Sequence, residues 1–445
     1  MPKLSFMSSW LLAASVLRAS ATILPLRPRQ DDQPASRVPF RMTGYGTLFG
    51  VDVEIGNQTF NLLFDTGSSD TWVVAPDYLC LDGWTEIPQK RCNYGPAYHE
   101  SPSFRAIDNE TLAIGLGLGH MIGNLGYDDV TVGGITVSGQ KIGVVNMTSD
   151  IADGVRSGIL GFGHPVLTSA HPAGFDYTNR SLLEEKLPYN PWLQSAAEQG
   201  KLEPYFSIAI ERSPLNDTDG AGGYLGLGAV VDVPTTSKFV TVPAEVNKAI
   251  PLELTNGEPT ITLWTLTVQG TTTDGNTNST PFQAVPDTGN TFNVYPAALA
   301  AAINAAFDPP GTLVASEMDQ YFLYAVECDA KPPAHSVVIG NASFPHEPAD
   351  LIFRNGMEGG CVSSIAGWNA QGGPEAYFLG SAFFKNVVAV YDFGKEEMRF
   401  ASRTAKTLDG DAASGVGQVR PASGMAVSVS MLLSVVALLS LGGVF

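Results

Sequence analysis

The sequence predicts an all-β protein made of two related lobes with a cleft between them, and three observations carry this prediction. From Tyr45 onward, short runs of alternating apolar and polar residues are broken by glycine, which is typical of strands and turns. Gly and Pro are abundant, at 47 and 30 residues of 445, and follow no fixed period, which also favours strands joined by tight turns. An internal duplication divides the chain into two comparable halves.

The clearest periodic segments give the expected elements. A period near two predicts strands over residues 47–55, 59–64, 129–132 and 135–137. Helical candidates are few, and the best are residues 181–185, 192–199 and 297–306. We therefore expect strands to dominate the fold.

The duplication is centred on an Asp-Thr-Gly tripeptide that occurs once in each half. One apolar strand runs into Asp65-Thr66-Gly67, and a second runs into Asp287-Thr288-Gly289. Each half then contains an apolar pair followed by glycine, at Ile159-Leu160-Gly161 and at Phe378-Leu379-Gly380. One such tripeptide alone reads as a turn, but two in matching contexts indicate two lobes whose loops meet at a shared cleft.

Paired carboxyl groups explain why a site would need this tripeptide twice. An Asp at a strand end points into the groove, Thr can hydrogen-bond to the partner loop, and Gly lets a backbone N–H approach the carboxylate. Two carboxyls about 3 Å apart share one proton, so the charged one can activate a water and the protonated one can donate to a carbonyl. We therefore expect Asp65 and Asp287 to form an acid–base pair that needs no cofactor.

Both ends of the chain carry targeting signals. Lys3, the apolar run 4–17 and Ala19-Ser20-Ala21 predict a secretory signal peptide cut after Ala21, with a buried N-terminal helix as the alternative. The uncharged run 425–445 follows small residues and a polar spacer, which predicts a GPI-attachment signal with attachment between residues 411 and 414. A transmembrane helix is the alternative for this run.

The chain is thus expected to divide into six parts. These are a signal peptide (1–21), a short leader or propeptide (22–41), an N-terminal β lobe (42–235), a C-terminal β lobe (236–405), a polar linker with the attachment region (406–424) and a removed hydrophobic tail (425–445). This division predicts a protein of the secretory pathway, anchored at the extracellular face of the plasma membrane or in the cell wall. A monomer is the default expectation.

Cysteines and glycosylation sequons agree with export. Sequential pairing of Cys80 with Cys92 and of Cys328 with Cys361 would close one loop in each half. No Cys-x-x-Cys occurs and no His lies at ligand spacing from a Cys, so no metal site is expected. The sequons that predict a glycosylated surface are at Asn57, Asn109, Asn146, Asn179, Asn216, Asn278 and Asn341.

Charge and motif content exclude several other classes of protein. The formal net charge is −19 at pH 7, which excludes nucleic acid as a partner and favours an acidic working environment. The ends predicted to be removed carry Lys3, Arg18 and Arg420 but no acid, so the mature chain is more acidic still. The scattered histidines lack a Ser-centred elbow, and the glycines of 115–119 lack the Lys-Ser/Thr of a phosphate loop.

With these motifs the chain resembles the pepsin family of aspartic peptidases over residues 45–401. Residues 64–73 (Phe-Asp-Thr-Gly-Ser-Ser-Asp-Thr-Trp-Val) are similar to the family's first active-site loop, while 129–134 and 377–394 are similar to the segment after its flap and to its closing strands. The resemblance implies a bilobal pepsin-like acid protease fold, Asp65 and Asp287 as catalytic residues, and peptide or protein substrates. The predicted signal and tail resemble those of the fungal secreted, GPI-anchored (yapsin-like) branch.

The resemblance also implies roles for residues around the pair. The supporting residues would be Thr66, Gly67, Ser68, Thr288, Gly289 and Asn290, with Ser68 hydrogen-bonded to the outer oxygen of Asp65. Trp72 would line the cleft behind the flap. The flap resembles residues 114–120, which places Leu116, followed by Gly117, where the family has Tyr.

Two further departures from the family pattern leave another function open. Asn290 replaces the usual Thr or Ser, although its amide could still donate to Asp287, and Pro286 removes a backbone donor. With Leu116, these changes would suit a pepsin-fold binding protein without useful turnover, whereas the intact pair favours an endopeptidase active at acidic pH. A glycosidase would need wider carboxylate spacing and an aromatic sugar platform.

Overall fold

The computed structural model describes residues 36–116, 119–178, 181–314, 321–354, 360–368 and 375–403. The chain forms two units, 1–34 and 35–445, and every element described below belongs to the second. The predicted signal peptide, attachment region and hydrophobic tail lie outside the described residues. The last residues of the predicted leader belong to the first strand, and cleavage of the leader stays a prediction.

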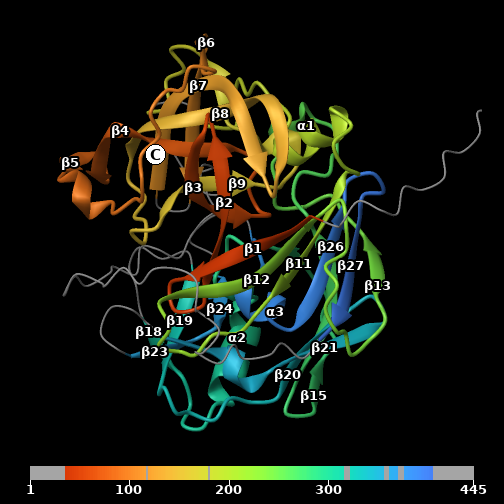
Figure 1. The fold of residues 1–445 in the computed structure, drawn as a ribbon. Coiled ribbons are helices and arrows are strands. Elements are labelled where there is room, and N and C mark those ends of the chain that lie inside the picture. The colour runs from red at the N-terminus through yellow and green to blue at the C-terminus, as the bar shows by residue number, and fades with distance from the viewer. Residues whose placement is uncertain are drawn as a thin grey trace, which may run out of the picture. The chain divides into compact units, whose positions relative to one another are not determined.

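The larger sheet is built from both ends of the chain (Figure 1). Its strands are β1 Ser36–Thr43, β2 Leu48–Ile55, β3 Gln58–Asp65, β4 Thr71–Asp82, β5 Thr85–Ile87, β6 Arg105–Leu116, β7 Gly119–Val132, β8 Ile135–Thr148, β9 Arg156–Gly161, β10 Ala170–Pro172, β11 Tyr205–Ile210, β12 Asp219–Leu227, β13 Val240–Pro243, β26 Val387–Asp392 and β27 Glu397–Ser402. Their order is β10-β6-β7-β8-β4-β9-β3-β2-β1-β12-β11-β26-β27-β13, and β5 pairs with β4. The last two strands pair with β11 and β13, so the end of the fold completes a sheet that its beginning starts.

The second sheet comes from the second half of the chain alone. Its strands are β14 Leu266–Thr273, β15 Asn276–Asn278, β16 Phe282–Pro286, β17 Asn293–Tyr295, β18 Thr312–Val314, β19 Tyr321–Val326, β20 His335–Ile339, β21 Ala342–His346, β22 Ile352–Arg354, β23 Cys361–Ser363, β24 Ile365–Trp368 and β25 Phe378–Leu379. The main path is β21-β20-β14-β16-β25-β17-β24-β19-β23-β22.

Helices in the described residues are short. They are α1 Trp192–Glu198, α2 Ala297–Ala305 and α3 Ser381–Phe384, with the 3-10 turns η1 Gln89–Arg91, η2 Pro165–Leu167, η3 Leu252–Thr255 and η4 Pro348–Leu351. The strand-dominated fold is therefore confirmed, as are the four predicted strands, which correspond to β2 and to parts of β3, β7 and β8; the first of them begins one residue later than predicted. Two predicted helices correspond to α1 and α2.

The helix predicted over residues 181–185 is wrong. The backbone N–H groups of Leu183 and Glu184 donate to the hydroxyl and carbonyl of Ser181, which closes a local turn. Glu185 has a φ of 50°, which lies in the left-handed region and ends any helical path. A five-residue segment forms too few helical hydrogen bonds to offset the free-energy cost of helix nucleation, and Ser favours such turns over helix interiors.

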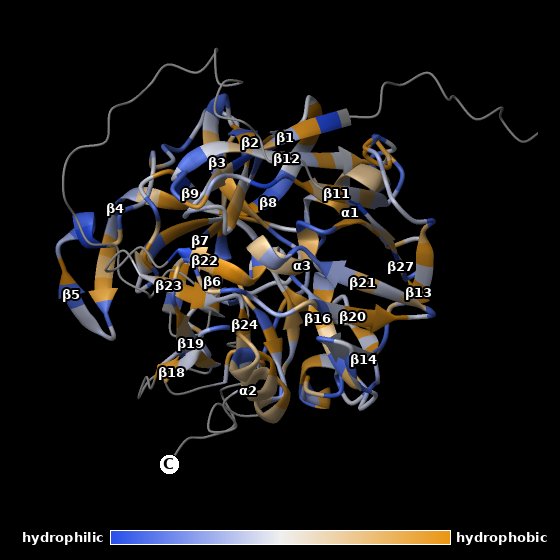
Figure 2. Cartoon of the chain, turned by 90° about the horizontal axis from the view of Figure 1, so that it is seen from below, coloured by the Kyte–Doolittle hydropathy of each residue, from blue (hydrophilic) through white to orange (hydrophobic). Residues whose placement is uncertain are grey.

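An aromatic cluster in the core contacts both Asp-Thr-Gly loops. Ring centroids lie 4.8 Å apart in Phe64 and Phe162, and 4.8 Å apart in Phe206 and Tyr391. Phe64 precedes the first loop, and the Tyr391 hydroxyl donates to the carbonyl of Pro286 before the second loop. Burial of each such ring contributes about 1.5–3 kcal/mol, so the core stabilises the positions of both loops. Figure 2 shows hydrophobic residues concentrated along the central strands, with hydrophilic residues in the outer turns.

The duplicated sequence motif has a direct structural counterpart. In each half, the strand that ends at the Asp pairs in parallel with the strand that ends at the apolar-apolar-Gly: β3 with β9, and β16 with β25. A Cβ atom at Gly161 would lie 2.6 Å from the backbone of Ser69, and one at Gly380 would lie 2.4 Å from the carbonyl of Phe292. The glycine of the motif is therefore required because the Asp-Thr-Gly loop of the same half passes against it.

Both predicted disulfides are confirmed, Cys80 with Cys92 and Cys328 with Cys361. The sequon asparagines within the described ranges are all exposed, whereas Asn179 lies outside them. Glycosylation and the lobe boundary near residue 235 stay predictions. Among the described residues no helix is long and apolar enough to cross a bilayer. In the same part of the chain no three His, Cys, Asp or Glu side chains are grouped to hold a metal ion.

Candidate active site

Asp65 and Asp287 lie side by side, one from each half of the chain. A Cβ atom at Gly67 would lie 2.7 Å from the carboxyl carbon of Asp287, and one at Gly289 would lie 2.5 Å from Oδ1 of Asp65. Each loop glycine therefore faces the carboxyl group of the other half, at a distance that only glycine permits. Both carboxyl groups are fully buried.

The two carboxyl groups have similar inner contacts but different outer contacts. The N–H of Gly67 donates to Oδ1 of Asp65, and that of Gly289 donates to Oδ1 of Asp287, both at 2.8 Å. Oδ2 of Asp65 accepts a hydrogen bond from the hydroxyl of Ser68 at 2.5 Å, as the resemblance implied. Oδ2 of Asp287 is buried without a hydrogen-bond partner in the described part of the chain. The two carboxyl groups also interact with each other through a side-chain hydrogen bond.

Burial raises the pKa of both carboxyl groups, most strongly that of Asp287. At Asp65 the hydrogen bonds from Ser68 and Gly67 oppose this rise because they stabilise the charged form. At Asp287 the neighbouring charge of Asp65 adds to the rise. The surroundings thus favour the anion on Asp65 and the proton on Asp287, within a pair that titrates as one unit.

Thr66 and Thr288 fasten the two loops to each other through four hydrogen bonds. The backbone N–H of each donates to the hydroxyl of the other, at 3.1 and 3.0 Å. The Thr66 hydroxyl donates to the carbonyl of Pro286 at 3.1 Å, and the Thr288 hydroxyl donates to that of Phe64 at 2.9 Å. Since all these groups are buried, the four bonds hold the two carboxyl groups at contact distance.

Pro286 does not interrupt the sheet. Val285 and Asp287, on either side of it, donate their N–H groups to carbonyls in and next to β25 at 2.9 and 3.0 Å. In a parallel ladder alternate residues donate to one neighbour, so the missing N–H falls at a position that β25 does not use. The proline carbonyl accepts from both Thr66 and Tyr391.

Asn290 contacts Tyr321 instead of the carboxyl group of Asp287. Its amide nitrogen donates to the Tyr321 hydroxyl at 3.3 Å, and its amide oxygen accepts from the N–H of Phe292 at 3.1 Å. The expected donation from the amide to Asp287 is therefore absent from the described contacts, and the backbone N–H of Asn290 supports the charged form instead. Sequence reasoning missed Tyr321, because it lies on β19, far along the chain, with no motif around it.

Comparison with known proteins agrees with this geometry. A family profile described as "Eukaryotic aspartyl protease" matches residues 49–403. The chain belongs to this family. It is 36% identical over 370 residues to the "Probable aspartic-type endopeptidase" of Aspergillus fumigatus, covering 80% of this chain and 79% of the relative. It is 27% identical over 380 residues to rhizopuspepsin of Rhizopus chinensis, covering 80% and 81% of the two chains.

A solved structure shows the same fold. The aspartic proteinase from Irpex lacteus superimposes with a TM-score of 0.63 at 20% identity, covering 83% of this chain and 98% of that one. This aspartyl protease therefore has the bilobal pepsin-like architecture that the sequence predicted. Its relatives make it an aspartic-type endopeptidase.

The hairpin of β6 and β7 is the segment that resembles the protease flap. Leu116 pairs with Gly119 at its far end, and Gly117 lies outside the described residues. Trp72, expected to line the cleft, is buried and packs edge-on against Tyr94 with ring centroids 6.0 Å apart. Contact of Leu116, Gly117 or Trp72 with substrate stays a prediction.

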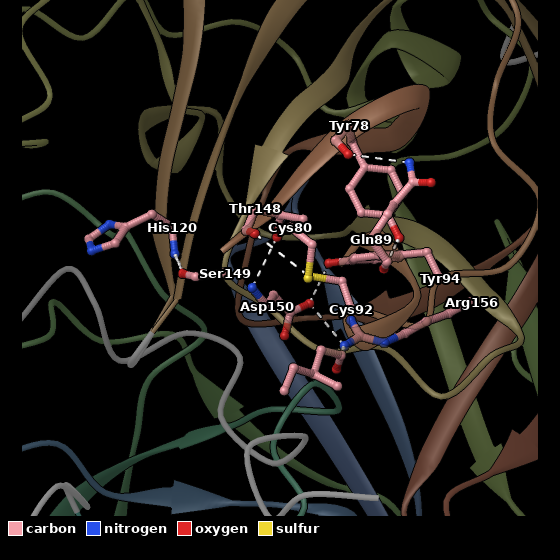
Figure 3. Close-up of a disulfide and its surroundings, with 11 residues drawn as sticks. Tyr78, Cys80, Gln89, Cys92, Tyr94, His120, Thr148, Ser149, Asp150 and Arg156 are labelled. Atoms are coloured by element: carbon pink, nitrogen blue, oxygen red, sulfur yellow. Dashed lines mark hydrogen bonds and ion pairs between the residues drawn. A yellow bond between two sulfur atoms is a disulfide. The ribbon is translucent and has the colours of Figure 1, made fainter. Parts of the chain in front are cut away.

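The hairpin is joined, next to its far end, to the segment that follows β8 (Figure 3). The N–H of His120 donates to the Ser149 hydroxyl at 2.8 Å, and the N–H of Ser149 donates back to the His120 carbonyl at 3.0 Å. The next residue, Asp150, accepts from the Tyr94 hydroxyl at 2.7 Å. The far end of the hairpin is thereby joined to the ring that packs on Trp72.

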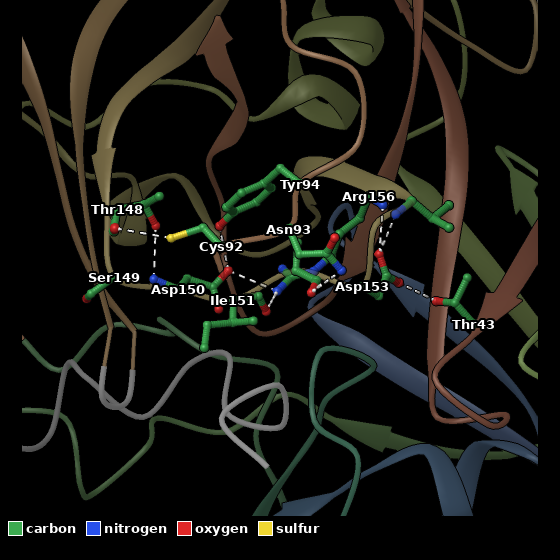
Figure 4. Close-up of polar contacts among 12 residues, drawn as sticks. Thr43, Cys92, Asn93, Tyr94, Thr148, Ser149, Asp150, Ile151, Asp153 and Arg156 are labelled. Carbon is green, nitrogen blue, oxygen red and sulfur yellow. Dashed lines mark hydrogen bonds and ion pairs between the residues drawn. The ribbon is translucent and has the colours of Figure 1, made fainter. Parts of the chain in front are cut away.

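Arg156 is the buried cation of this region (Figure 4). It donates to Asp150 at 2.9 Å and to the carbonyl of Ile151 at 2.8 Å. Burial lowers the pKa of Arg156, but the charges of Asp150, Tyr94 and Asp153 outweigh burial and raise it overall. Asp153 also accepts from the Thr43 hydroxyl at 2.7 Å, so the cluster links the segment after β8 to β1.

Proposed function

We propose that Asp65 and Asp287 are the catalytic residues of this endopeptidase and that it cuts peptides at acidic pH. The observation that carries the proposal is the contact between two fully buried carboxyl groups, each with a raised pKa. Such a pair holds one proton in common and so supplies a base and an acid at one point.

The local contacts support different proposed roles for the two residues at the start of the reaction. Asp65, stabilised as an anion by Ser68 and Gly67, takes a proton from the attacking water. Asp287, with its proton favoured by burial and by the charge of Asp65, donates to the carbonyl oxygen of the bond to be cut. When the C–N bond breaks, Asp65 passes the proton from the water to the leaving amine and Asp287 takes its own proton back from the former carbonyl oxygen, so no covalent intermediate forms.

The pH dependence follows from the direction of the pKa shifts. The pair is active while it holds one proton, and loses that proton as the pH rises through the raised pKa of Asp287. Activity is therefore expected in weakly acidic solution and is expected to fall towards alkaline pH. The strongly negative net charge is consistent with an acidic working environment.

Extended peptides are the proposed substrates. A polypeptide can lie as an added strand across the cleft, with its backbone hydrogen-bonded and its side chains in pockets on either side of the cut. The β6–β7 hairpin, joined next to its far end to Ser149, is the element that we propose covers such a chain.

A direct test uses the purified ectodomain on a denatured protein between about pH 3 and about pH 6, with and without pepstatin. Cleavage that pepstatin blocks and that Asp65→Asn abolishes supports the proposal. Asp77→Asn, an exposed carboxyl on β4, is the matched control and should retain activity. Cleavage that persists in Asp65→Asn contradicts the assignment, and pepstatin binding without cleavage would indicate a binding protein.

We also propose export to the cell surface through a GPI anchor. The two disulfides and the exposed sequons support export, and the apolar run 425–445 supports the anchor. Full-length protein in a fungal host should be released from membranes by a phosphatidylinositol-specific phospholipase. A variant that ends at residue 424 should appear in the medium, and phospholipase-resistant membrane protein would favour a transmembrane tail.

A further inference from the structure

Two buried histidines lie in the sheet that carries the second catalytic loop. His335 on β20 and His346 on β21 are paired in register, and their ring centroids are 5.2 Å apart. Only 2% and 4% of their surfaces are exposed. The proposed mechanism uses neither of them.

Asn293 connects His346 to the strand that holds Asp287. Its amide oxygen accepts the N–H of Gly380 at 2.8 Å, and its amide nitrogen lies 2.9 Å from Nε2 of His346. Gly380 follows Leu379, whose carbonyl accepts the N–H of Asp287 at 3.0 Å. One side-chain amide therefore joins the histidine to the support of the catalytic loop.

The orientation of this amide fixes the proton on His346. Because the amide oxygen of Asn293 already accepts from Gly380, its amide nitrogen must donate towards the ring. Nε2 of His346 is therefore the acceptor, and the ring proton lies on Nδ1. Nδ1 is buried and has no hydrogen-bond partner among the described residues.

A protonated His346 cannot keep this arrangement. The imidazolium carries an N–H on both nitrogens, so Nε2–H would face the amide NH₂ of Asn293, donor against donor. Turning the amide over would satisfy the ring but would place the NH₂ against the N–H of Gly380. One of the two hydrogen bonds is lost in either case, and a buried donor without an acceptor is destabilising by about 1–3 kcal/mol.

We propose that neutral His346 is a positioning residue for Asp287, acting through Asn293 and Gly380, and that its protonation in acid weakens this support. The inference rests on the proposed catalytic role of Asp65 and Asp287. It adds a second acid transition to the one that the carboxyl pair itself produces.

The surroundings of His346 support a transition in the working range. Burial lowers the pKa of His346 to about 4. Burial and then the charge of His346 lower the pKa of His335 well below its ordinary value, so His335 stays neutral while His346 titrates. The other titratable or charged groups on neighbouring elements are Tyr295 on β17, Glu347 beside the histidine, Asp350 of η4 with its partner Arg212, and Lys385 after α3.

The test is His346→Gln, which offers an amide oxygen to Asn293 and does not titrate. With a pKa of about 4, roughly one tenth of His346 is neutral at about pH 3. The ratio of kcat/KM at about pH 3 to that at about pH 5.5 should therefore rise by about three- to tenfold relative to the parent enzyme. Titration of active sites with pepstatin corrects each value for unfolded protein.

His335→Gln is the matched control, because His335 is equally buried on the paired strand but does not contact Asn293. Its pH ratio should equal that of the parent, and an unchanged ratio in His346→Gln would overturn the inference. Loss of all activity in Asp65→Asn at both pH values tests the proposed function separately. If His346→Gln fails to fold, the protonation state of His346 can be followed in the parent enzyme by nitrogen NMR of the histidine rings. A His346 ring that stays neutral at the pH where kcat/KM falls in acid also overturns the inference.

Discussion

Ser68 distinguishes the surroundings of the two carboxyl groups that we propose to be catalytic. Its hydroxyl donates to Oδ2 of Asp65, whereas Oδ2 of Asp287 has no such donor within the described residues. The hydrogen bond stabilises the charged form of Asp65, and this lowers a pKa that burial raises.

We expect Ser68→Ala to raise the pKa of Asp65, because the anion loses its closest donor. The pair would then ionise at higher pH, so the acid limb of the kcat/KM profile should move towards neutral pH. A charge-assisted hydrogen bond contributes about 1.5–3 kcal/mol, which corresponds to a loss of about tenfold or more at low pH. Ser68→Thr keeps the hydroxyl and should stay close to the parent profile. A Ser68→Ala profile that overlays the parent would contradict this role.

At the residue scale, the sequence could predict which residues form the candidate site better than it could predict which residues contact them. The two Asp-Thr-Gly motifs predicted Asp65 and Asp287, because each tripeptide carries its local chemistry with it. The partner of Asn290 could not be predicted, since Tyr321 comes from a strand whose position depends on the whole second sheet. The harmless position of Pro286 likewise depends on which neighbour β16 pairs with.

At the scale of elements, the mutual bonds of Thr66 and Thr288 hold the two loops together. Thr66→Val should remove both hydrogen bonds of the Thr66 hydroxyl and leave buried partners unpaired. We expect a loss of about 2–4 kcal/mol in the free energy of unfolding, measured in urea. Thr131→Val is the control, because the Thr131–Thr136 hydrogen bond is exposed, and it should change stability by less than about 0.5 kcal/mol. Equal effects of the two variants would show that the loops are held by other contacts.

The Arg156 cluster joins the segment after β8 to β1 and offers a second element-scale comparison. Arg156 is buried, and Arg156→Met leaves the partly buried carboxylates of Asp150 and Asp153 without their cation, which should cost about 3 kcal/mol of stability. Arg41→Met removes the exposed ion pair with Asp219, and should cost no more than about 1 kcal/mol. Thermal unfolding of the two variants gives the comparison, and a small effect at Arg156 would contradict the role of the cluster.

Strands were easier to predict than short helices and turns. The alternation of apolar and polar residues over 47–55 and 135–137 indicates a strand with one buried and one exposed face, so β2 and β8 could be predicted from the pattern. Residues 181–185 are too few for a helical period to stand out, and the side chain of Ser181 decided their conformation. The four residues of α3 give no periodic signal at all.

At the scale of the whole molecule, buried titratable groups should confine stability to a weakly acidic range. Burial lowers the pKa of His164, His171 and His346 to about 4. The unfolded chain protonates these histidines first, so stability should fall as the pH drops from about 6.5 towards 4. Burial raises the pKa of Asp65 and Asp287, so stability should also fall as the pH rises above their unfolded values near 4.

The expected result is a melting temperature with a maximum between about pH 4 and about pH 6.5, measured by calorimetry across the pH range. His164→Gln should make the melting temperature fall less steeply as the pH drops towards 4, because the variant has one buried histidine fewer whose pKa is lowered by burial. A melting temperature that rises steadily up to alkaline pH would contradict this account.

The duplication predicted two related lobes but not how the sheets are shared between the halves. Matching Asp-Thr-Gly motifs imply matching local folds, and the parallel pairs β3–β9 and β16–β25 bear this out. The addition of β26 and β27 to the sheet of the first half has no local signature, because it depends on pairing between strands far apart in the chain.

That late pairing has a consequence during synthesis on the ribosome. The two strand positions between β11 and β13 are occupied by β26 and β27 only when residues 387–402 have emerged. β25, which supports Asp287, emerges only shortly before. A growing chain therefore carries both aspartates before the strand that supports Asp287 has emerged. We expect the nascent chain to lack the assembled carboxyl pair until residues 378–402 have been added.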